Sequence, residues 1–136
     1  MTDAELRRRV AEARVARLAT VDAEGRPHLV PICFVLDGGT LYTAVDSKPK
    51  RTEALKRLEN VRVNPRVAVL VDHYEDDWSR LWWVRLDGRA RVVEDARERT
   101  RALVLLEAKY EQYQVEAPPG PVLAVEIERT SGWAAA

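Results

Sequence analysis

The sequence predicts a mainly β domain, built as a closed or split antiparallel barrel with a few short helices. Six short runs rich in apolar and β-branched residues are separated by Gly, Pro, Asn and Asp, and only three segments show helical periodicity. At 136 residues the chain has the size of one ordinary domain, so we expect a single domain over residues 1–136. Closing the sheet into a barrel also removes the unpaired edges that so many strands would otherwise expose.

The first half of the chain predicts two helices and three strands. Thr2 and Glu5 have the spacing of a capping box, and the apolar residues that follow recur at helical spacing. Glycine ends the turn at 22–25, and the Asp-Gly-Gly sequence at 37–39 is a strong hairpin signal. The expected helices span 3–13 and 52–58, and the expected strands span 16–21, 27–36 and 41–45.

The second half predicts three further strands and a third helix. Asn64 and Pro65 mark a turn, and Gly88 lies inside a long β run, where it indicates a bulge or a bend. Asp95 and Glu98 form a second capping pattern, which opens an amphipathic helix. The expected strands span 67–71, 81–93 and 122–128, with a solvated acidic loop at 73–77 and a rigid Pro-rich connector at 118–121.

The predicted second strand is the most informative segment, because residues 28–36 are apolar almost without a break. A strand with one wet face should alternate apolar and polar residues, so both of its faces should be covered. The core can cover one face, and a partner subunit, a bound planar molecule or both should cover the other. Pro31 removes a ladder hydrogen bond and indicates an edge strand or a bulge. The backbone groups freed there could bond a heterocycle with a pyrimidine-like edge.

Composition excludes several classes of protein. Lys plus Arg and Asp plus Glu number 22 each, so overall charge gives no reason to expect nucleic acid or an anionic membrane as a partner. No apolar run approaches the roughly 20 residues that a membrane span needs, and the N-terminus lacks an apolar signal core. The single cysteine, Cys33, cannot form an internal disulfide and fits a reducing compartment. We therefore expect a cytoplasmic protein.

Motifs for catalysis or metal binding are absent. The sequence has no phosphate loop, no dinucleotide fingerprint, no HExxH and no CxxC. His28 and His73 stand far apart without metal-ligand spacing, so no metal site is expected. Cys33 lies in an apolar strand, which is typical of an inert buried thiol. No serine has the context of a nucleophile elbow, and no catalytic residue can be assigned.

A basic cluster and the tryptophans are the remaining candidates for a site. Lys48, Lys50 and Arg51 precede a helix start, where free N–H groups and basic side chains together suit a phosphate; the alternative is a solvated helix face. Consecutive strand residues point to opposite faces, so of Trp82 and Trp83 one should fill the barrel and the other reach outward. The other two tryptophans are Trp78 and Trp133, and Trp133 either folds back over a cleft or belongs to a disordered tail.

These segments together resemble a known group of proteins. The stretch ARLATVDAEGRPHLVPICFVLDGGTLYTAVDSKPKR, then NPRVAVLVD, then WWVRLDGRARVVE, resembles the pyridoxamine 5′-phosphate oxidase-like superfamily, which has the FMN-binding split β-barrel fold. The finer resemblance is to its branch of oxidoreductases that use the deazaflavin coenzyme F420. It covers about residues 13–133 and depends on order and spacing rather than on one diagnostic motif.

The resemblance implies a homodimer with the cofactor in each interface cleft. The tricyclic ring would lie against the second and third strands, contacted largely by backbone groups, and Lys48, Lys50 and Arg51 would hold the phosphate. The implied ring contacts are Val30, Pro31, Ile32, Cys33, Ala44, Val45 and Asp46. An anionic oligoglutamate tail would follow Arg57, Arg62 or Arg66, and Trp78, Trp83 and Trp133 would form walls from either subunit.

Two departures from the family pattern limit the transfer of function. The basic signature that binds pyridoxal substrates is not recognisable, which argues against vitamin B6 oxidation. The segment 72–77 is acidic for a loop beside an anionic cofactor, so it should face away or gate the substrate.

Three functions stay open at this point. The first is hydride transfer from reduced F420 to a small conjugated acceptor, with Tyr42, His28 or water as the proton donor if one is needed. The second is an FMN-dependent oxidase or reductase of the same fold. The third is a binding protein that holds a flavin, a deazaflavin or a haem-type ligand without turnover.

Overall fold

The computed structural model describes residues 2–45 and 52–135, with side chains throughout those ranges except at 52–55. Four residues of the implied cofactor site lie outside the described residues: Asp46, Lys48, Lys50 and Arg51.

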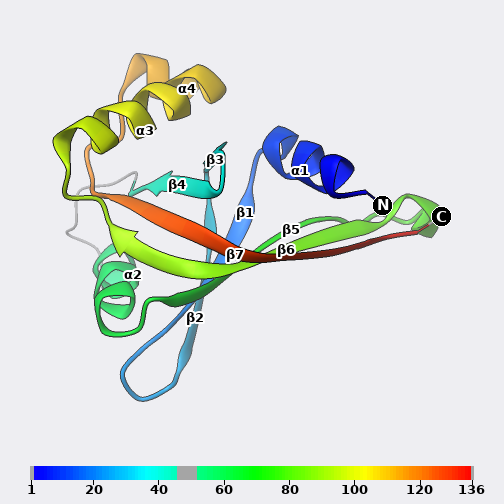
Figure 1. The fold of residues 1–136 in the computed structure, drawn as a ribbon, viewed down its shortest axis with the longest axis horizontal. Helices are drawn as coiled ribbons and strands as arrows, with labels where there is room; N and C mark the ends of the chain where they lie inside the picture. The colour runs from blue at the N-terminus through cyan, green and yellow to red at the C-terminus, as the bar shows by residue number, and fades with distance from the viewer. Residues whose placement is uncertain (1, 46–51, 136) are drawn as a thin grey trace.

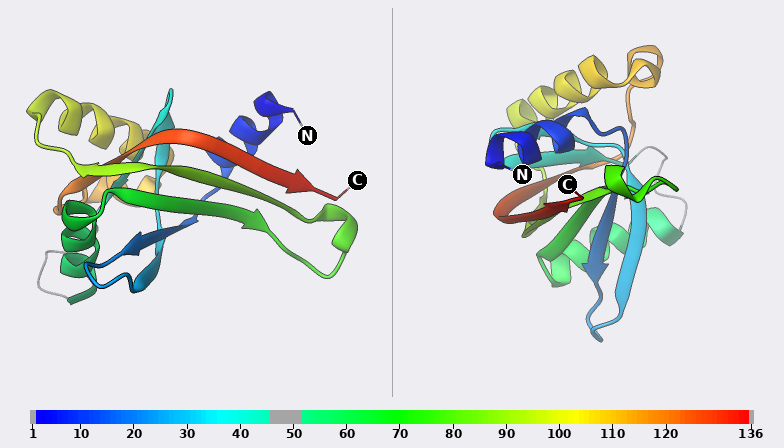
Figure 2. Two further views of the ribbon diagram at one scale, coloured as in Figure 1. Left: turned by 60° about the horizontal axis from the view of Figure 1, so that its bottom comes forward. Right: turned by 90° about the vertical axis from the view of Figure 1, so that its right-hand side faces the viewer.

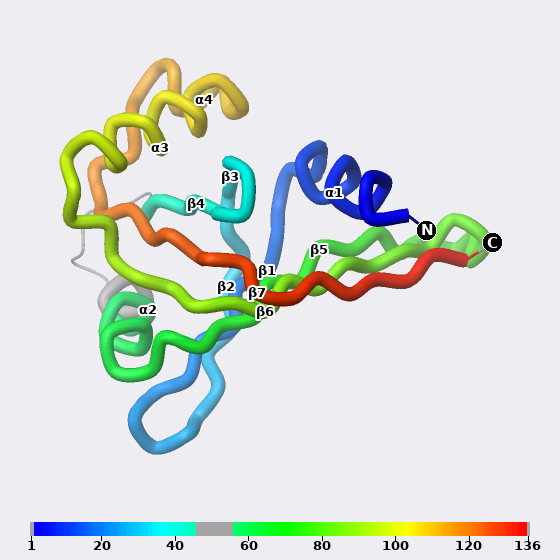
Figure 3. The backbone as a smooth tube through the Cα atoms, viewed as in Figure 1, coloured from blue at the N-terminus to red at the C-terminus, as the bar shows by residue number. Residues whose placement is uncertain are grey.

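One antiparallel sheet of seven strands forms the body of the molecule and curls into a half-barrel (Figures 1 and 2). Its spatial order is β2-β1-β5-β6-β7-β4-β3. Strands β5, β6 and β7 extend well beyond the others as an arm, which the tube in Figure 3 shows clearly. The strands are β1 (Ala16–Val21), β2 (Pro27–Ile32), β3 (Val35–Asp37), β4 (Thr40–Ala44), β5 (Arg66–His73), β6 (Trp82–Val92) and β7 (Val122–Ala134).

The helices pack around this sheet. They are α1 (Asp3–Glu12), α2 (Thr52–Val63), the 3₁₀ turn η1 (Trp78–Arg80), α3 (Ala96–Lys109) and α4 (Glu111–Val115). The capping box of α1 forms as expected, because the Thr2 side chain accepts from the Glu5 N–H and the Glu5 carboxylate accepts from the Thr2 N–H. The Asp95 side chain caps α3 by accepting a hydrogen bond from the Glu98 N–H, while the Glu98 carboxylate pairs with Arg91. None of the described helices is long and apolar enough to cross a membrane.

The expected strand 27–36 is wrong as a single strand, because the structure divides it into β2 and β3. The chain leaves the sheet after Ile32 and returns at Val35 on the opposite edge of the sheet. Phe34, between them, is fully buried, which explains why the apolar run continues across the break. Along β2 the residues do alternate, since Ile32 is buried whereas Leu29 is 66% exposed. The expected edge position of Pro31 is confirmed, since β2 is the last strand on its side.

The ends of one helix and one strand also differ from expectation, for reasons of packing and pairing. Helix α2 continues past 58 because Val61 lies one turn after Leu58 and joins the same core. Strand β7 continues past 128 because it pairs with the long strand β6 along its whole length. Trp133 therefore lies in a strand and does not belong to a disordered tail. A short helix, α4, follows α3 and was not expected.

The core has two parts on the two sides of the curled sheet. The larger part contains Leu18, Phe34 and Val69 beneath α1 and α2. The smaller part packs α3 and α4 on β4 and β7 through Tyr42, Leu106 and other residues. The expected turns form with left-handed glycines, Gly25 at φ 80° and Gly38 at φ 60°. The expected irregularity at Gly88 is confirmed as a register shift between β6 and β7.

Candidate functional site

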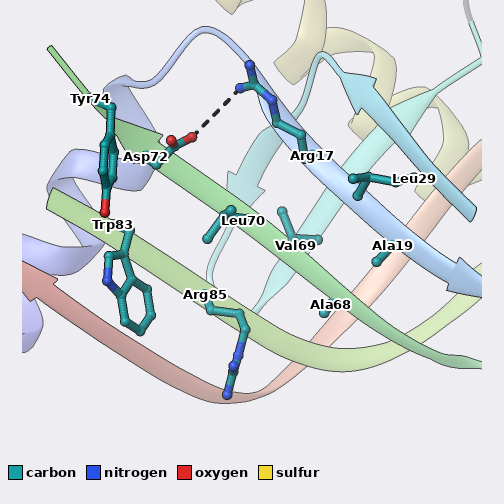
Figure 4. A pocket seen from close by; sticks show the side chains of 10 residues that line it. All are labelled: Arg17, Ala19, Leu29, Ala68, Val69, Leu70, Asp72, Tyr74, Trp83 and Arg85. Carbon is teal, nitrogen blue, oxygen red and sulfur yellow. Dashed lines mark ion pairs between the residues drawn. The ribbon is translucent and has the colours of Figure 1, made fainter. Parts of the chain in front are cut away.

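A shallow groove crosses the outer face of the sheet over β2, β1, β5 and β6 (Figure 4). Its volume is about 580 Å³. We call it the sheet groove, and it is lined by Arg17, Ala19, Leu29, Ala68, Val69, Leu70, Asp72, Tyr74, Trp83 and Arg85. The lining comes from four strands and from Tyr74 just after β5, so no short sequence motif encodes it.

Strand alternation produces the floor of the sheet groove. In β1 the buried Leu18 points into the core and Ala19 faces outward, and in β5 the buried Val67 alternates with Ala68 and Leu70. Ala19 lies directly opposite Ala68 in the β1–β5 ladder. Because these two alanine side chains are small and their neighbours are larger, a hollow forms above them.

Aromatic and aliphatic side chains form the ends of the sheet groove. Figure 4 shows Tyr74 and Trp83 together at one end and Leu29 toward the other. Trp133 lies directly across from Trp83 in the β6–β7 ladder and is 45% exposed. The expected division of the consecutive tryptophans is confirmed, because Trp82 packs against the core while Trp83 lines the groove.

Charged side chains surround the apolar floor. The Arg17 guanidinium lies 3.9 Å from the Asp72 carboxylate, and the Arg85 Nε lies 3.2 Å from a carboxylate oxygen of Asp87. Exposed ion pairs of this kind contribute little to stability, so a ligand could rearrange them at small cost. Within the described ranges, no group of three or more His, Cys, Asp or Glu side chains is arranged to hold a metal ion. The groove therefore suits a flat, largely apolar body with polar groups at its edge.

The structure separates the residues expected to contact a cofactor ring. Pro31 is exposed and lies opposite Arg17, so it borders the sheet groove. Ile32, Ala44 and Val45 are buried in the cores, and only their backbone could face a ligand. Three further residues also lie apart from the groove lining: Val30 packs against the core, Cys33 lines a different cavity, and Trp78 is 76% exposed on η1.

Neither named candidate for a proton donor lines the sheet groove. The Tyr42 hydroxyl donates a hydrogen bond of 2.8 Å to Glu98. Burial and the neighbouring Glu98 carboxylate raise the pKa of Tyr42 to about 12. His28 is half-buried and lies opposite the buried Thr20, on the other face of β2 from Leu29. Of the three proton donors expected from the sequence, Tyr42, His28 and water, only water can serve at this groove.

A partly buried polar cluster fixes helix α2 against the β1–β2 hairpin. Asp22 accepts a 2.9 Å hydrogen bond from Arg26 Nε, and the Lys56 Nζ lies 3.4 Å from the same carboxylate. The hydrogen bond from Arg26 is the main reason that the pKa of Asp22 lies well below its usual range. One turn further on, Asn60 donates to the buried Thr20 hydroxyl at 3.0 Å. These contacts orient α2, the helix that begins directly after the residues expected to bind a phosphate.

The arginines expected to bind an anionic tail and the acidic segment occupy several parts of the fold. Arg57 is half-buried in α2, Arg62 is exposed in its last turn, and Arg66 is exposed at the start of β5. Asp72, which we expected to face away or gate the substrate, lies in the groove, whereas Asp77 caps η1 at the tip of the arm.

Sequence reasoning missed most of the groove lining. Of its ten residues only Trp83 was expected in the site. A usable signal was present, because Ala19 and Ala68 are small residues at outward positions of strands that are otherwise rich in large side chains. That signal becomes meaningful only once the β1–β5 register places the two alanines opposite each other.

Comparisons with known proteins identify relatives over almost the whole chain. The family model described as pyridoxamine 5′-phosphate oxidase matches residues 2–134. A conserved hypothetical protein from Mycobacterium tuberculosis is 25% identical, over 98% of this chain and 85% of that chain, with a TM-score of 0.79. An FAD-binding protein from Mesorhizobium loti is 26% identical, over 97% of this chain and 94% of that chain, with a TM-score of 0.74.

More distant structures share the fold alone. The haem storage protein HutZ from Vibrio cholerae is 19% identical, over 97% of this chain and 93% of that chain, with a TM-score of 0.73. A search of curated proteins finds no match. The expected split antiparallel barrel is confirmed by the curled sheet and by these structural neighbours.

Proposed function

The chain belongs to the pyridoxamine 5′-phosphate oxidase family, and we propose that it is an oxidoreductase that uses the deazaflavin coenzyme F420 to transfer hydride to a small conjugated acceptor. The observation that carries the proposal is the sheet groove, an apolar hollow of about 580 Å³ on an open sheet face. Its shape and chemistry fit a planar tricyclic ring better than a charged or flexible substrate.

The fit of a ring depends on the flat floor and the aromatic end of the groove. Ala19 and Ala68 leave room above the strands, and Leu29 and Leu70 offer apolar contact on either side of them. Trp83 can contact the ring or the acceptor, since aromatic side chains pair favourably with flat aromatic ligands. The backbone beside Pro31 borders the groove and supplies hydrogen-bonding groups for the polar edge of the ring.

Basic residues would hold the charged parts of the cofactor. In this proposal Lys48, Lys50 and Arg51 hold the phosphate just before α2, whose orientation is fixed by its contacts to the β1–β2 hairpin. Arg57, Arg62 and Arg66 follow along α2 and the start of β5, where they would hold an anionic tail.

A second copy of the chain would complete the site. Leu29 is 66% exposed and Trp133 is 45% exposed, and both lie on or beside the groove. Covering them with the sheet of a partner would bury the outer face of β2 and exclude water from the groove. The cofactor, when bound, supplies the hydride. The protein supplies orientation and a dry site, and orientation alone can account for roughly 7–11 kcal/mol of a reaction barrier.

Two alternatives have specific support. The FAD-binding relative from Mesorhizobium loti favours a flavin in place of the deazaflavin, with the same groove and the same phosphate residues. The haem storage protein among the structural neighbours favours a protein that binds a planar ligand without turnover. The lack of an assigned proton donor in the groove agrees with either alternative and with hydride transfer.

Cofactor titration of the purified protein tests the choice of ligand. We expect quenching of cofactor fluorescence at micromolar F420 and much weaker binding of FMN and FAD. Charge reversal of Arg62 and Arg66 should weaken F420 binding and leave FMN binding nearly unchanged, because FMN has no glutamate tail. Preferential binding of FMN or FAD would show that the cofactor is a flavin and not F420. Binding of none of the three would overturn the cofactor proposal.

Filling the groove tests its location. Ala68→Phe places a large side chain in the hollow without touching the core, so the fold should persist while cofactor binding falls at least tenfold. Ala11→Phe, on the exposed surface of α1, is the matched control. Unchanged affinity in Ala68→Phe would show that the ring binds elsewhere. Measuring the oligomeric state of both variants separates loss of the ring site from loss of the dimer.

A further inference from the structure

A second cavity lies where the β1–β2 pair meets the junction of α3 and α4. Its volume is about 430 Å³ and its lining residues are Arg14, Cys33, Tyr110, Gln112 and Tyr113. Arg14 shortly precedes β1, Cys33 directly follows β2, and Tyr110 separates α3 from α4. We call it the α4 cavity. It shares no residue with the sheet groove.

Two cations meet at one aromatic ring beside this cavity. The guanidinium carbon of Arg14 lies 4.7 Å from the centroid of the Tyr110 ring, and the Lys109 Nζ lies 5.3 Å from the same centroid. Arg14 also donates a 2.9 Å hydrogen bond to the Lys109 carbonyl. The Lys109 Nζ approaches the buried Phe34 ring more closely still, at 3.8 Å from its centroid.

These two positive charges lack an anionic partner in the described part of the chain. The Lys109 Nζ is enclosed and has no hydrogen-bond acceptor among the described residues. Arg14 stacks on a ring and bonds a carbonyl, neither of which carries a negative charge. Burial, and then the nearby Arg14, lower the pKa of Lys109 to about 8. An enclosed ammonium that contacts only aromatic rings keeps part of its desolvation cost, and an anion bound nearby would reduce that cost.

The remaining walls indicate the body of the ligand. The rings of Tyr110 and Tyr113 lie 5.5 Å apart at 61°, an edge-to-face arrangement that offers flat apolar surface. Gln112 adds an amide to the lining. We propose that the α4 cavity binds a small aromatic carboxylate, whose carboxylate pairs with Arg14 in the cavity wall and whose ring packs on the tyrosines. The enclosed Lys109 ammonium, behind the Tyr110 ring, adds positive charge to this end of the cavity. The site goes beyond the proposed oxidoreductase function, because it requires no flavin or deazaflavin.

The only cysteine of the chain makes the proposal measurable, since the half-buried Cys33 thiol lines the α4 cavity. Dithiobis(nitrobenzoate) is an aromatic disulfide with carboxylates, and dithiodipyridine is an uncharged aromatic disulfide. In either reaction the Cys33 thiolate attacks one sulfur, a mixed disulfide forms, and the second thiolate leaves with the electron pair and is measured by absorbance. Neighbouring cations activate the thiol toward both reagents alike. The ratio of the two rates therefore reports recognition of the carboxylate.

The expected result concerns the cofactor-free protein. Relative to a free thiol such as glutathione, the rate ratio should favour the anionic reagent by about tenfold or more, and benzoate should slow the anionic reagent. Arg14→Gln and Lys109→Met should each bring the ratio close to that of the free thiol. Arg80→Gln, an exposed cation on η1, should leave it unchanged. Loss of a neighbouring cation should slow the reactions with both reagents alike, so only a change in the ratio of the two rates reports loss of carboxylate recognition.

Two results would overturn the proposal: a wild-type ratio equal to that of the free thiol, or a ratio that both cavity variants retain. Because Arg14 is exposed, Arg14→Gln should fold even if the loss of the Lys109 amine disturbs packing. The assay contains no cofactor, so neither result bears on whether the sheet groove binds F420 or a flavin.

Discussion

The hydroxyl of Tyr110 joins three segments that are far apart in the sequence. It accepts a 3.0 Å hydrogen bond from the Phe34 N–H and lies 3.1 Å from the Phe34 carbonyl and 3.0 Å from the Arg14 carbonyl. One hydroxyl proton can serve only one of these two carbonyls well at a time. Phe34 itself is fully buried, so its N–H has no access to water.

Tyr110→Phe removes this hydroxyl and leaves the ring in place. The Phe34 N–H then becomes a buried donor without a partner, a state that costs about 1–3 kcal/mol, and one hydrogen bond to a carbonyl is lost as well. We expect the free energy of unfolding to fall by about 2 kcal/mol or somewhat more. For a chain of this length that corresponds to a decrease in Tm of roughly 5–10 °C.

Urea unfolding followed by tryptophan fluorescence at one fixed protein concentration measures the effect. Tyr74→Phe is the matched control, because the Tyr74 side chain is 64% exposed and should change stability by less than about 0.5 kcal/mol. A loss in Tyr110→Phe as small as that of the control would refute the reasoning. It would mean that the Phe34 N–H finds another partner, or that the segment between β2 and β3 opens to water.

Three further predictions concern acid stability, strand packing and alkaline stability. Hydrogen bonds from Arg91 and Tyr42 lower the pKa of Glu98 from 4.5 to about 2, so this carboxylate stabilises the fold above its unfolded-state pKa and stops doing so as the pH falls through that interval. Glu98→Gln should flatten the acid limb of a pH–stability curve, and a curve identical to wild type would contradict the assignment. Gly88→Ala would drive the new Cβ into the backbone oxygen of Glu126 on the neighbouring strand β7, so the unfolding midpoint of this variant in urea should drop. Gly39→Ala, with open space around it, serves as the control. Burial lowers the pKa of Lys109 from 10.5 to about 8, so the folded protein releases this proton at a lower pH than the unfolded chain does, and the free energy of unfolding should increase as the pH rises between these two values. Lys109→Met should abolish this increase, which urea unfolding at the two pH values measures.

Local signals predicted the elements of this fold well. The capping box at Thr2, the N-cap at Asp95 and the turns at Gly25 and Gly38 are decided by residues within a few positions of one another, and all four appear where expected. The failures came where the deciding contact lies far away in the sequence. The break between β2 and β3 is set by Phe34, which enters the core and meets a tyrosine 76 residues later.

The candidate site was harder to predict because it belongs to the face of a sheet rather than to a motif. Ala19 and Ala68 are unremarkable in their own strands and create a hollow only because the ladder sets them opposite each other. The β6–β7 ladder likewise places Trp133 across from Trp83, so that a second large aromatic side chain lies beside the groove-lining Trp83. The resemblance to the family predicted a ring beside β2, but it transferred residues whose side chains, such as those of Ile32 and Val45, point into the core. A cofactor at this face could reach such residues only through their backbone, so specificity for F420 or a flavin should depend on the outward side chains from four strands. Mutations at Ala19, Ala68 and Trp83 should therefore change cofactor preference more than mutations at the inward residues, which should chiefly change stability.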